Sequence, residues 1–407
     1  MSRSSSVRRV AIVFSGGPAP AANAVISACT LSFLDAGIEV IGILDGYSRL
    51  QDHVAGAPLV EGEHFIRLDV GHVSGIRNRK SILIRTARAN PSEGIEKPGD
   101  LADPVCNRKL AAVYCALEEL EVDGLVSIGG DDTLRTANNL HCYPGVVPGH
   151  RPISVVHLPK TIDNDYNGID WTFGFASAVD YSAREIRNLG ADASSTNTWY
   201  VLELMGRKSG WLTYAAGIAG EATRMISVED VGETFDVDRC AADLAALMLK
   251  RESEGKSYGI VCVAEGLASL VAEDDREVDD RGYSLLGSVR IGERLARATE
   301  RAYALAAGRP VHVRAKQIGY EVRCAEPVAT DILLGSQLGV GAYHAIVEKG
   351  RAGHMVSVKD QLQLVYVPFD ELIDPVTMKT RVRFIDTASD FYRLARALEY
   401  GHSHPES

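Results

Sequence analysis

Short apolar runs alternate with amphipathic segments along the first half of the chain. The apolar runs are rich in β-branched residues and occupy residues 10–14, 40–44, 124–128 and 153–157. Between them, residues 21–36 and 107–119 repeat apolar side chains at helical spacing. Strands that alternate with helices are typical of a parallel sheet with helices on both faces. We therefore predict an α/β layer of this kind.

The same pattern starts again in the second half. Strands are expected at residues 199–204 and 258–264, and helices at residues 176–189, 212–220 and 237–251. Glycine, proline and charged residues mark loops at 93–104, 143–152 and 273–282. The last loop is strongly acidic but lacks the glycine and the carboxylate spacing of a calcium loop, so a solvated surface loop is expected. The predicted fold class is α/β, with two Rossmann-like three-layer α/β/α domains and mostly parallel sheets.

Composition narrows the class of protein. The 407 residues exceed one typical domain, and contents of 46% hydrophobic and 24% charged residues exclude a disordered or collagen-like chain. The net charge is −11, so general attraction to nucleic acid or to anionic membranes is not expected, and any phosphate must be bound locally. The seven cysteines are scattered without a CxxC pair, which suggests neither a disulfide framework nor a zinc site.

No targeting segment is evident near the N-terminus. The apolar stretch at residues 10–14 is too short for a signal peptide, and no apolar run is long enough to span a bilayer. A cytoplasmic protein is the default expectation.

The first chemical signal is a glycine loop between the strand at 10–14 and the following helix. Residues 15–23 read SGGPAPAAN. Glycines there allow backbone N–H groups to face an anion, and the helix adds its positive N-terminal end. A tight turn without a ligand remains the alternative. The loop is neither GxGxxG nor a Walker A sequence, so dinucleotide and P-loop interpretations lose support.

The second signal is the sequence GGDDT at residues 129–133, again after a strand. Open α/β sheets bind ligands at the carboxyl ends of their strands. Two adjacent carboxylates, Asp131 and Asp132, suit a hydrated Mg²⁺, which takes only one or two protein carboxylates. The alternative is a plain helix N-cap.

Two further strand ends add cations and a base. Residues 159–165 read PKTIDND and combine a lysine, a hydroxyl and two aspartates. Residues 204–210 read LMGRKSG, in which Arg207 can bind a phosphate with both arms of its guanidinium. Phosphoryl transfer needs a carboxylate for the acceptor proton, cations over the transferred group and a metal on the donor. A simple Asx turn and a surface arginine are the ordinary alternatives.

Taken together, these motifs closely resemble the phosphofructokinase family, whose members phosphorylate the 1-hydroxyl of fructose 6-phosphate. The resemblance runs from Val10 to about Val367. It rests on GGPAP, GGDDT, PKTIDND and MGRKSG, on the triplet AEG at residues 264–266, and on Arg314 followed by GYEVR at residues 319–323.

The resemblance implies a role for each matching residue. Asp163 resembles the general base, and Asp131 the Mg²⁺ ligand. Residues that resemble the sugar-phosphate site are Thr161, Ile162, Met205, Gly206, Arg207, Glu265, Arg314, Tyr320, Glu321, Val322 and Arg323. Residues that resemble the phosphoryl-donor site are Gly17, Arg88, Gly130 and Thr133.

Asp132 and Lys160 bear on the phosphoryl donor, because ATP-using members have glycine at both positions. A carboxylate at Asp132 would repel a nucleotide α-phosphate, by about 4 kcal/mol at ~4 Å and an effective dielectric constant of ~20. Lys160 would place a cation beside the transferred phosphoryl group. The pair is similar to the pyrophosphate-dependent, non-allosteric bacterial branch, which implies a reversible reaction that serves glycolysis and gluconeogenesis.

Some features leave alternatives open. Many relatives have an arginine at the position of Thr198, ahead of MGR. An ATP-dependent or broader sugar-phosphate kinase, for example one acting on sedoheptulose 7-phosphate, and a non-catalytic regulatory subunit therefore remain alternatives.

The resemblance also implies a domain plan and an assembly. Residues 1–174 with 321–370 would bind pyrophosphate and Mg²⁺, and residues 175–320 with 371–407 would bind the sugar phosphate, with the active site in a cleft between them. Because family members lend the arginine that matches Arg314 to a neighbouring subunit, a homodimer or homotetramer is expected.

Overall fold

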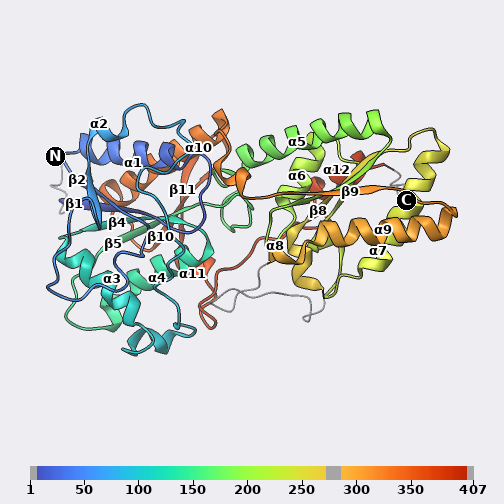
Figure 1. Cartoon of the computed structure of the whole chain (residues 1–407). Helices are drawn as coiled ribbons and strands as arrows, with labels where there is room; N and C mark the ends of the chain where they lie inside the picture. Colours follow the sequence, from blue (N-terminus) through green and yellow to red (C-terminus); the bar gives the residue numbers. More distant parts are fainter. Residues whose placement is uncertain (1–6, 272–285, 401–407) are drawn as a thin grey trace. The chain divides into compact units, whose positions relative to one another are not determined.

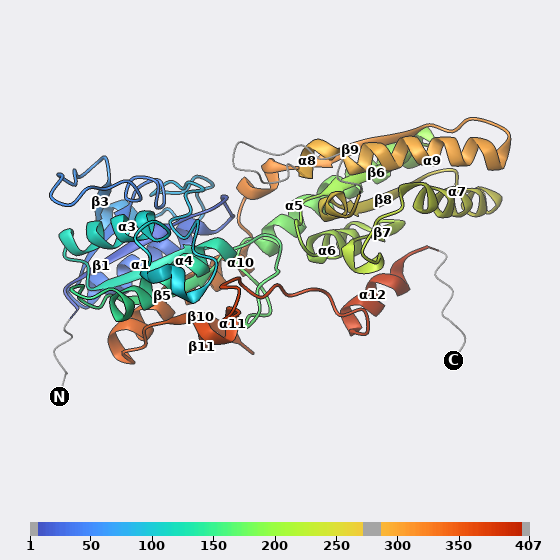
Figure 2. The ribbon, with the colours of Figure 1, turned by 90° about the horizontal axis from the view of Figure 1, so that it is seen from below.

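The computed structural model describes residues 7–271 and 286–400, so the acidic loop predicted at 273–282 lies outside the described residues. The chain divides into two compact units. Unit 1 contains Met1–Ile162, Tyr166–Ala176 and Arg323–Val382, and unit 2 contains Asp163–Asp165, Ser177–Val322 and Arg383–Ser407. Figures 1 and 2 show both units from two directions.

Unit 1 is built on a 7-stranded sheet of order β11-β10-β5-β4-β1-β2-β3. Its inner strands are parallel, while the edge strands β3 and β11 run antiparallel to their neighbours. β1 and β4 are buried almost throughout, as expected for parallel strands covered on both faces. The strands are β1 (Arg9–Phe14), β2 (Glu39–Ile43), β3 (Phe65–Leu68), β4 (Gly124–Gly129), β5 (Ser154–Pro159), β10 (His354–Lys359) and β11 (Gln363–Pro368).

Helices cover both faces of this sheet. α1 (Ala22–Asp35) and α10 (Ala329–Tyr343) lie on one face, and α3 (Arg108–Glu119) and α4 (Asp131–Val146) lie on the other (Figure 1). The shorter helical segments of unit 1 are α2 (Val70–Val73), η1 (Pro98–Ala102), the π-helical η6 (His344–Glu348) and α11 (Phe369–Leu372).

Unit 2 contains a 4-stranded, fully parallel sheet of order β7-β8-β6-β9. Its strands are β6 (Trp199–Leu204), β7 (Arg224–Ile226), β8 (Gly259–Ala264) and β9 (Val313–Ile318). α7 (Val237–Ser253) and α9 (Ile291–Ala307) pack against the face that carries Trp199, Val201 and Val263. The other helices of this unit are α5 (Phe175–Thr196), α6 (Trp211–Gly220), α8 (Leu286–Val289), α12 (Asp390–Leu398), η2 (Val228–Asp230) and η3 (Glu265–Leu270), while η5 (Tyr320–Cys324) spans a crossing of the chain.

The C-terminal segment closes unit 2 through buried ionic contacts. The Glu399 carboxylate is fully buried and accepts hydrogen bonds from the backbone N–H of Met225 and from Arg224. Arg396 lies 3.1 Å from Glu399 and 3.8 Å from Asp230. Burial raises the pKa of Glu399 above its usual range. Glu399, together with the buried Ile385 and Ala395, therefore anchors the segment after residue 383 to this unit.

The α/β prediction is confirmed, with differences at several boundaries. The helix expected from residue 21 begins at Ala22, because Ala21 has a left-handed backbone with φ 64°. The loop predicted at 143–152 is wrong at its start, since α4 runs to Val146 with Pro144 inside it. Tyr143 is buried against Tyr114, which keeps that last turn helical. The helix expected at 176–189 continues to Thr196.

Two crossings between the units lie within two residues of those expected near 174 and 321, and the third lies later than the one expected near 371. The chain crosses after Ala176, Val322 and Val382, and residues 163–165 make a further excursion into unit 2. The last crossing is later because Phe369 and Leu372 of α11 are buried against the unit 1 sheet. Among the described residues, no helix combines the length and the apolarity that a membrane span requires.

Glycines on α10 set its distance from α1. A Cβ added at Gly339 would lie 2.6 Å from the carbonyl oxygen of Val25 and 2.8 Å from the backbone nitrogen of Cys29. We expect Gly339→Ala to lower the free energy of unfolding by about 1–3 kcal/mol, because backbone atoms cannot yield to the new methyl group.

Gly190 on α5 is the matched control, since an added Cβ there meets nothing within 4 Å. Gly190→Ala should raise the free energy of unfolding by about 0.4–1 kcal/mol by restricting the unfolded chain. Urea unfolding of both variants measures this difference. Shifts of the same sign and size would contradict the packing argument.

Candidate functional site

The predicted site residues of unit 1 follow three adjacent strands. β5, β4 and β1 are neighbours in the sheet, so the segments after Pro159, Gly129 and Phe14 begin at one edge. Hydrogen bonds join them: Ser15 N–H donates to the Ile128 carbonyl at 2.9 Å, and Lys160 N–H donates to the Gly129 carbonyl at 2.9 Å. The edge is the position at which open parallel sheets bind ligands.

Two cations lie against the glycine loop. A Cβ added at Gly16 would lie 3.2 Å from Lys160 Nζ, and one added at Gly17 would lie 3.1 Å from Arg323 Nη1. Gly16 has φ 90°, a backbone region that favours glycine. Lys160 is only 6% exposed, and its ammonium lies 5.6 Å from the ring centre of Phe14. Two cationic side chains beside a glycine turn are suited to binding phosphate.

Two donor-site candidates follow directly from this arrangement. Gly16 N–H donates to the Ala87 carbonyl at 2.9 Å, so the segment with the exposed Arg88 runs beside the glycine loop. The family resemblance grouped Arg323 with the sugar-phosphate residues. In the structure Arg323 belongs to unit 1 and contacts the glycine loop, which makes it a candidate for the donor site.

The paired aspartates form the first turn of α4. Asp131 is partly exposed and Asp132 is exposed, and Asp132 N–H donates to Asp131 Oδ1 at 3.0 Å. Gly129 is required here, since a Cβ would lie 2.3 Å from Thr133 Oγ1. Accessible carboxylate oxygens beside Gly130 fit a hydrated Mg²⁺, which keeps most of its waters.

A buried polar chain fixes the position of the Gly129 carbonyl. Tyr166 O–H donates to that carbonyl at 3.1 Å, and His157 Nε2 lies 3.1 Å from the same phenol oxygen. Because the phenol proton is committed to Gly129, His157 must donate from Nε2 and remain neutral. Burial accordingly lowers the pKa of His157 to about 3, and its Nδ1 has no hydrogen-bond partner.

The PKTIDND segment passes from one unit to the other within the motif. Thr161 and Ile162 belong to unit 1, where the Thr161 carbonyl accepts a hydrogen bond from Thr172 Oγ1 at 2.8 Å and Ile162 is buried. Asp163 belongs to unit 2 and is partly exposed, and its carbonyl accepts a hydrogen bond from Ser209 Oγ at 3.5 Å.

Arg383 holds the Asp163 end of this segment. Its guanidinium donates to the Asn164 carbonyl at 2.8 Å, and its backbone N–H donates to the Asp165 carbonyl at 2.8 Å. Asn164 has φ 54°, a left-handed conformation that asparagine tolerates better than most residues. The Arg383 guanidinium also stacks 4.8 Å from the ring centre of Trp211. Arg383 was not predicted from the sequence. It belongs to no motif, and only the fold brings it to the Asn164–Asp165 segment.

The predicted residues of unit 2 repeat the same arrangement at another edge. They follow β8, β6 and β9, which are neighbours in that sheet. Gly266 N–H donates to the Gly206 carbonyl at 3.0 Å, which joins the Met205–Arg207 turn to Glu265 at the start of η3. Arg207 is exposed, and Glu265 is 8% exposed.

The remaining candidates lie on β9 and just after it. Tyr320, Glu321 and Val322 form the first part of η5, with Tyr320 71% exposed and Val322 buried. Arg314 is exposed on the edge strand β9, where its Nη1 donates to Tyr200 Oη at 2.9 Å and lies 3.3 Å from Asp192. Thr198 is buried and bonds to Thr196.

Comparison with protein-family models gives a match to the model described as Phosphofructokinase over residues 9–346. The chain belongs to the phosphofructokinase family.

Individual relatives agree on the family and differ in the donor that their names give. A pyrophosphate–fructose 6-phosphate 1-phosphotransferase of Thermotoga maritima is 34% identical over 95% of this chain and 89% of its own length. One of Naegleria fowleri is 31% identical over 96% of this chain and 87% of its own. An ATP-dependent 6-phosphofructokinase of Chloroflexus aurantiacus is 33% identical over 89% of this chain and 90% of its own.

Solved structures support the fold. The pyrophosphate-dependent phosphofructokinase of Marinobacter aquaeolei matches with a TM-score of 0.70 at 16% identity, covering 98% of this chain and 94% of that one. Yeast phosphofructokinase from Saccharomyces cerevisiae matches with a TM-score of 0.65 at 23% identity, covering 89% of this chain and 45% of that one. These likenesses identify the phosphofructokinase fold.

The neutral state of the buried His157 predicts a pH dependence of stability. The pKa of His157 is about 3 when folded and 6.5 in the unfolded chain, so only the unfolded state takes up its proton between these values. Stability is therefore lost as pH falls below 6.5. Urea unfolding should show a loss of about 2 kcal/mol from this residue between pH 6.5 and 5. A His157→Gln variant should lack that component, and equal pH slopes in both proteins would refute the assignment.

Proposed function

We propose that the chain catalyses reversible, Mg²⁺-dependent transfer of a phosphoryl group from pyrophosphate to the 1-hydroxyl of fructose 6-phosphate. The observation that carries the proposal is the position of Lys160, buried with its ammonium at the Gly16 turn. A fixed cation there can bind pyrophosphate or the phosphate that leaves it, without any nucleotide contact.

Asp132 supports the same donor. Its exposed carboxylate stands in the first turn of α4, beside the aspartate proposed to hold the metal. Repulsion of a nucleotide α-phosphate at ~4 Å would be about 4 kcal/mol, or on the order of a thousandfold in rate or binding. Sequence identity does not decide the donor. The chain is 34% identical to an enzyme named for pyrophosphate and 33% identical to an enzyme named for ATP.

The residues of unit 1 would bind the donor. Arg323, Lys160 and Arg88 would neutralise its phosphate oxygens, with Gly17, Gly130 and Thr133 shaping the turns around it. Asp131 would hold Mg²⁺, which when bound would neutralise further charge on the donor. None of these roles requires a base from unit 1.

The residues of unit 2 would bind the acceptor and take its proton. The Asp163 carboxylate would accept the proton of the 1-hydroxyl as its oxygen attacks phosphorus, the P–O bond of pyrophosphate breaks, and phosphate leaves. Residues proposed to bind the sugar phosphate are Met205, Gly206, Arg207, Glu265, Tyr320, Glu321 and Val322, with Thr161 and Ile162 at the junction.

A homo-oligomer is part of the proposal. Arg314 points from an edge strand of unit 2 and is exposed, a position from which it could serve a neighbouring subunit. The reaction is proposed to take place in the cytoplasm.

An ATP-dependent 6-phosphofructokinase is the second candidate, because the Chloroflexus aurantiacus relative is nearly as similar as the pyrophosphate-named ones. Initial rates with fructose 6-phosphate, Mg²⁺ and either donor distinguish the two. We expect turnover with pyrophosphate and little with ATP, and a shift of preference toward ATP in the double variant Asp132→Gly with Lys160→Gly.

Asp238→Gly is the matched control for this test, since Asp238 is also an exposed aspartate at the second position of a helix, α7. It should leave the donor preference unchanged. Equal or better use of ATP by the wild type would overturn the electrostatic account of Asp132.

The proton acceptor gives a separate prediction. Asp163→Asn keeps the size of the side chain but cannot take up a proton, so kcat should fall by about a hundredfold to ten-thousandfold. The KM for fructose 6-phosphate should change far less. Asp170→Asn, an exposed aspartate seven positions later, should retain wild-type kinetics. A mutant of Asp163 with nearly normal kcat would exclude it as the base.

A further inference from the structure

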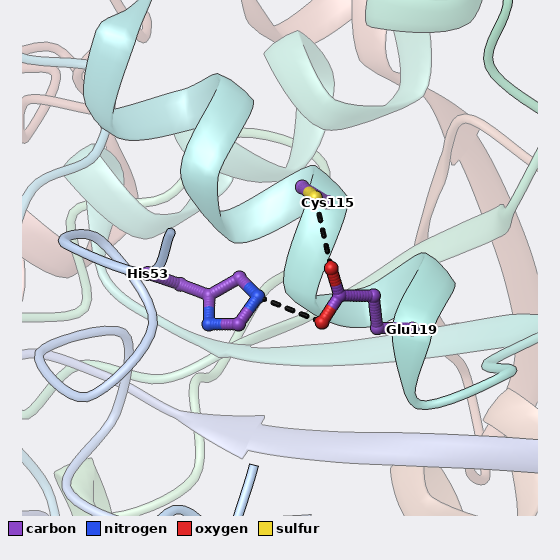
Figure 3. Close-up of side chains that lie close together, drawn as sticks. All are labelled: His53, Cys115 and Glu119. Atoms are coloured by element: carbon purple, nitrogen blue, oxygen red, sulfur yellow. Dashed lines mark hydrogen bonds and ion pairs between the residues drawn. The ribbon is translucent and has the colours of Figure 1, made fainter. Parts of the chain in front are cut away.

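A second group of possible metal ligands lies on unit 1, apart from the strand-end loops. His53, Cys115 and Glu119 point toward one another (Figure 3). Cys115 and Glu119 are one turn apart on α3, and His53 comes from the loop between β2 and β3. One ligand atom from each residue lies within 4.8 Å of the others.

The Glu119 carboxylate lies at the centre of the group and remains partly exposed to solvent. His53 Nε2 lies 2.9 Å from Glu119 Oε2, and Cys115 Sγ lies 3.6 Å from Glu119 Oε1. The Oε1 atom also accepts a hydrogen bond from Gly56 N–H at 2.8 Å, which holds the carboxylate in place. The His53 side chain is 4% exposed, and that of Glu119 is 32% exposed. The imidazole is therefore fixed, while solvent reaches the cluster past the carboxylate.

An imidazole nitrogen, a thiol sulfur and a carboxylate oxygen form a ligand set that zinc accepts. Zinc binds nitrogen and oxygen at roughly 2.0–2.2 Å and sulfur at about 2.3 Å, which separates tetrahedral ligand atoms by roughly 3.3–3.6 Å. The distance of 3.6 Å from Cys115 Sγ to Glu119 Oε1 matches this range, and the distance of 2.9 Å from His53 Nε2 to Glu119 Oε2 needs to lengthen by a few tenths of an ångström for a metal to enter. Magnesium and calcium prefer sites made of oxygen alone.

We propose that His53, Cys115 and Glu119 bind one divalent transition-metal ion of the zinc class. The metal takes the place of the proton on His53 Nε2, the neutral imidazole then carries its proton on Nδ1, and Cys115 loses its thiol proton to solvent on binding. Three protein ligands leave a fourth position for water. The sequence suggested no zinc site because only one cysteine contributes, and its partner His53 is brought to it by the fold.

The proposed site is separate from the one at which Mg²⁺ is proposed. Glu119 ends α3, which leads into the start of β4, whereas Asp131 follows the far end of that strand. A six-residue strand spans roughly 20 Å. The inference does not depend on the proposed function, because it concerns loop and helix residues that take no part in the reaction.

Metal binding to the full-length protein tests the proposal. The protein is treated with a chelator, transferred to buffer containing Mg²⁺, and titrated with Co²⁺ while its absorption spectrum is recorded. We expect one equivalent of Co²⁺, with a thiolate-to-cobalt charge-transfer band in the near ultraviolet, and displacement by Zn²⁺. Zn²⁺ should also raise the thermal unfolding temperature.

Variants assign the band to the cluster. Cys115→Ser should abolish the band, and His53→Gln should weaken Co²⁺ binding by about tenfold or more. Cys142→Ser, which changes another partly exposed thiol on a neighbouring helix of unit 1, is the control and should behave as the wild type. Glu119→Gln is the second variant if Cys115→Ser does not fold, and it should also weaken binding.

Two results would overturn the proposal. One is a wild type that binds much less than one equivalent of Co²⁺ or shows no thiolate band. The other is a band that persists in Cys115→Ser. In either case the three side chains form only a hydrogen-bonded contact between the loop and α3.

Discussion

The site depends on the shared edge of parallel strands. In a parallel sheet all carboxyl ends point the same way, so neighbouring strands deliver their following residues to one place. β1, β4 and β5 do this in unit 1, and β6, β8 and β9 do it in unit 2. Each turn then needs a residue that permits close approach, which is why glycine stands at Gly16, Gly129 and Gly206. The residues of each group come from widely separated segments, so their nearness depends on strand pairing and not on closeness in the sequence.

A second feature is that Lys160 and Asp163, three positions apart in one motif, belong to different units. Lys160 and Arg323 lie at the glycine loop of unit 1, while Ser209 bonds the Asp163 carbonyl and Arg383 bonds the Asn164 carbonyl in unit 2. The peptide bond after Ile162 joins the two units directly. The backbone of the motif is therefore fixed separately on each side of that peptide bond.

The local hydrophobic pattern predicted much of the fold. Apolar runs located β1, β4, β6 and β8, because buried parallel strands need continuous apolar side chains. It did not predict the short or exposed strands β3 and β9, whose burial is incomplete. Arg383 and His53 were missed for another reason: each acts through a partner distant in the chain, and no local pattern encodes that contact. The left-handed Ala21 was missed because alanine gives no signal of it.

The pair formed by His157 and Tyr166 has a consequence for how the sequence can vary. Replacing Tyr166 alone with an apolar residue leaves the His157 Nε2–H without its partner inside the core, at the cost of an unsatisfied buried group. Replacing His157 alone leaves the phenol O–H still donating to the Gly129 carbonyl. Replacing both by apolar side chains of similar volume removes that cost. The two positions therefore differ in how freely they can vary: the histidine can change while the tyrosine stays, whereas losing the tyrosine first strands a buried N–H group.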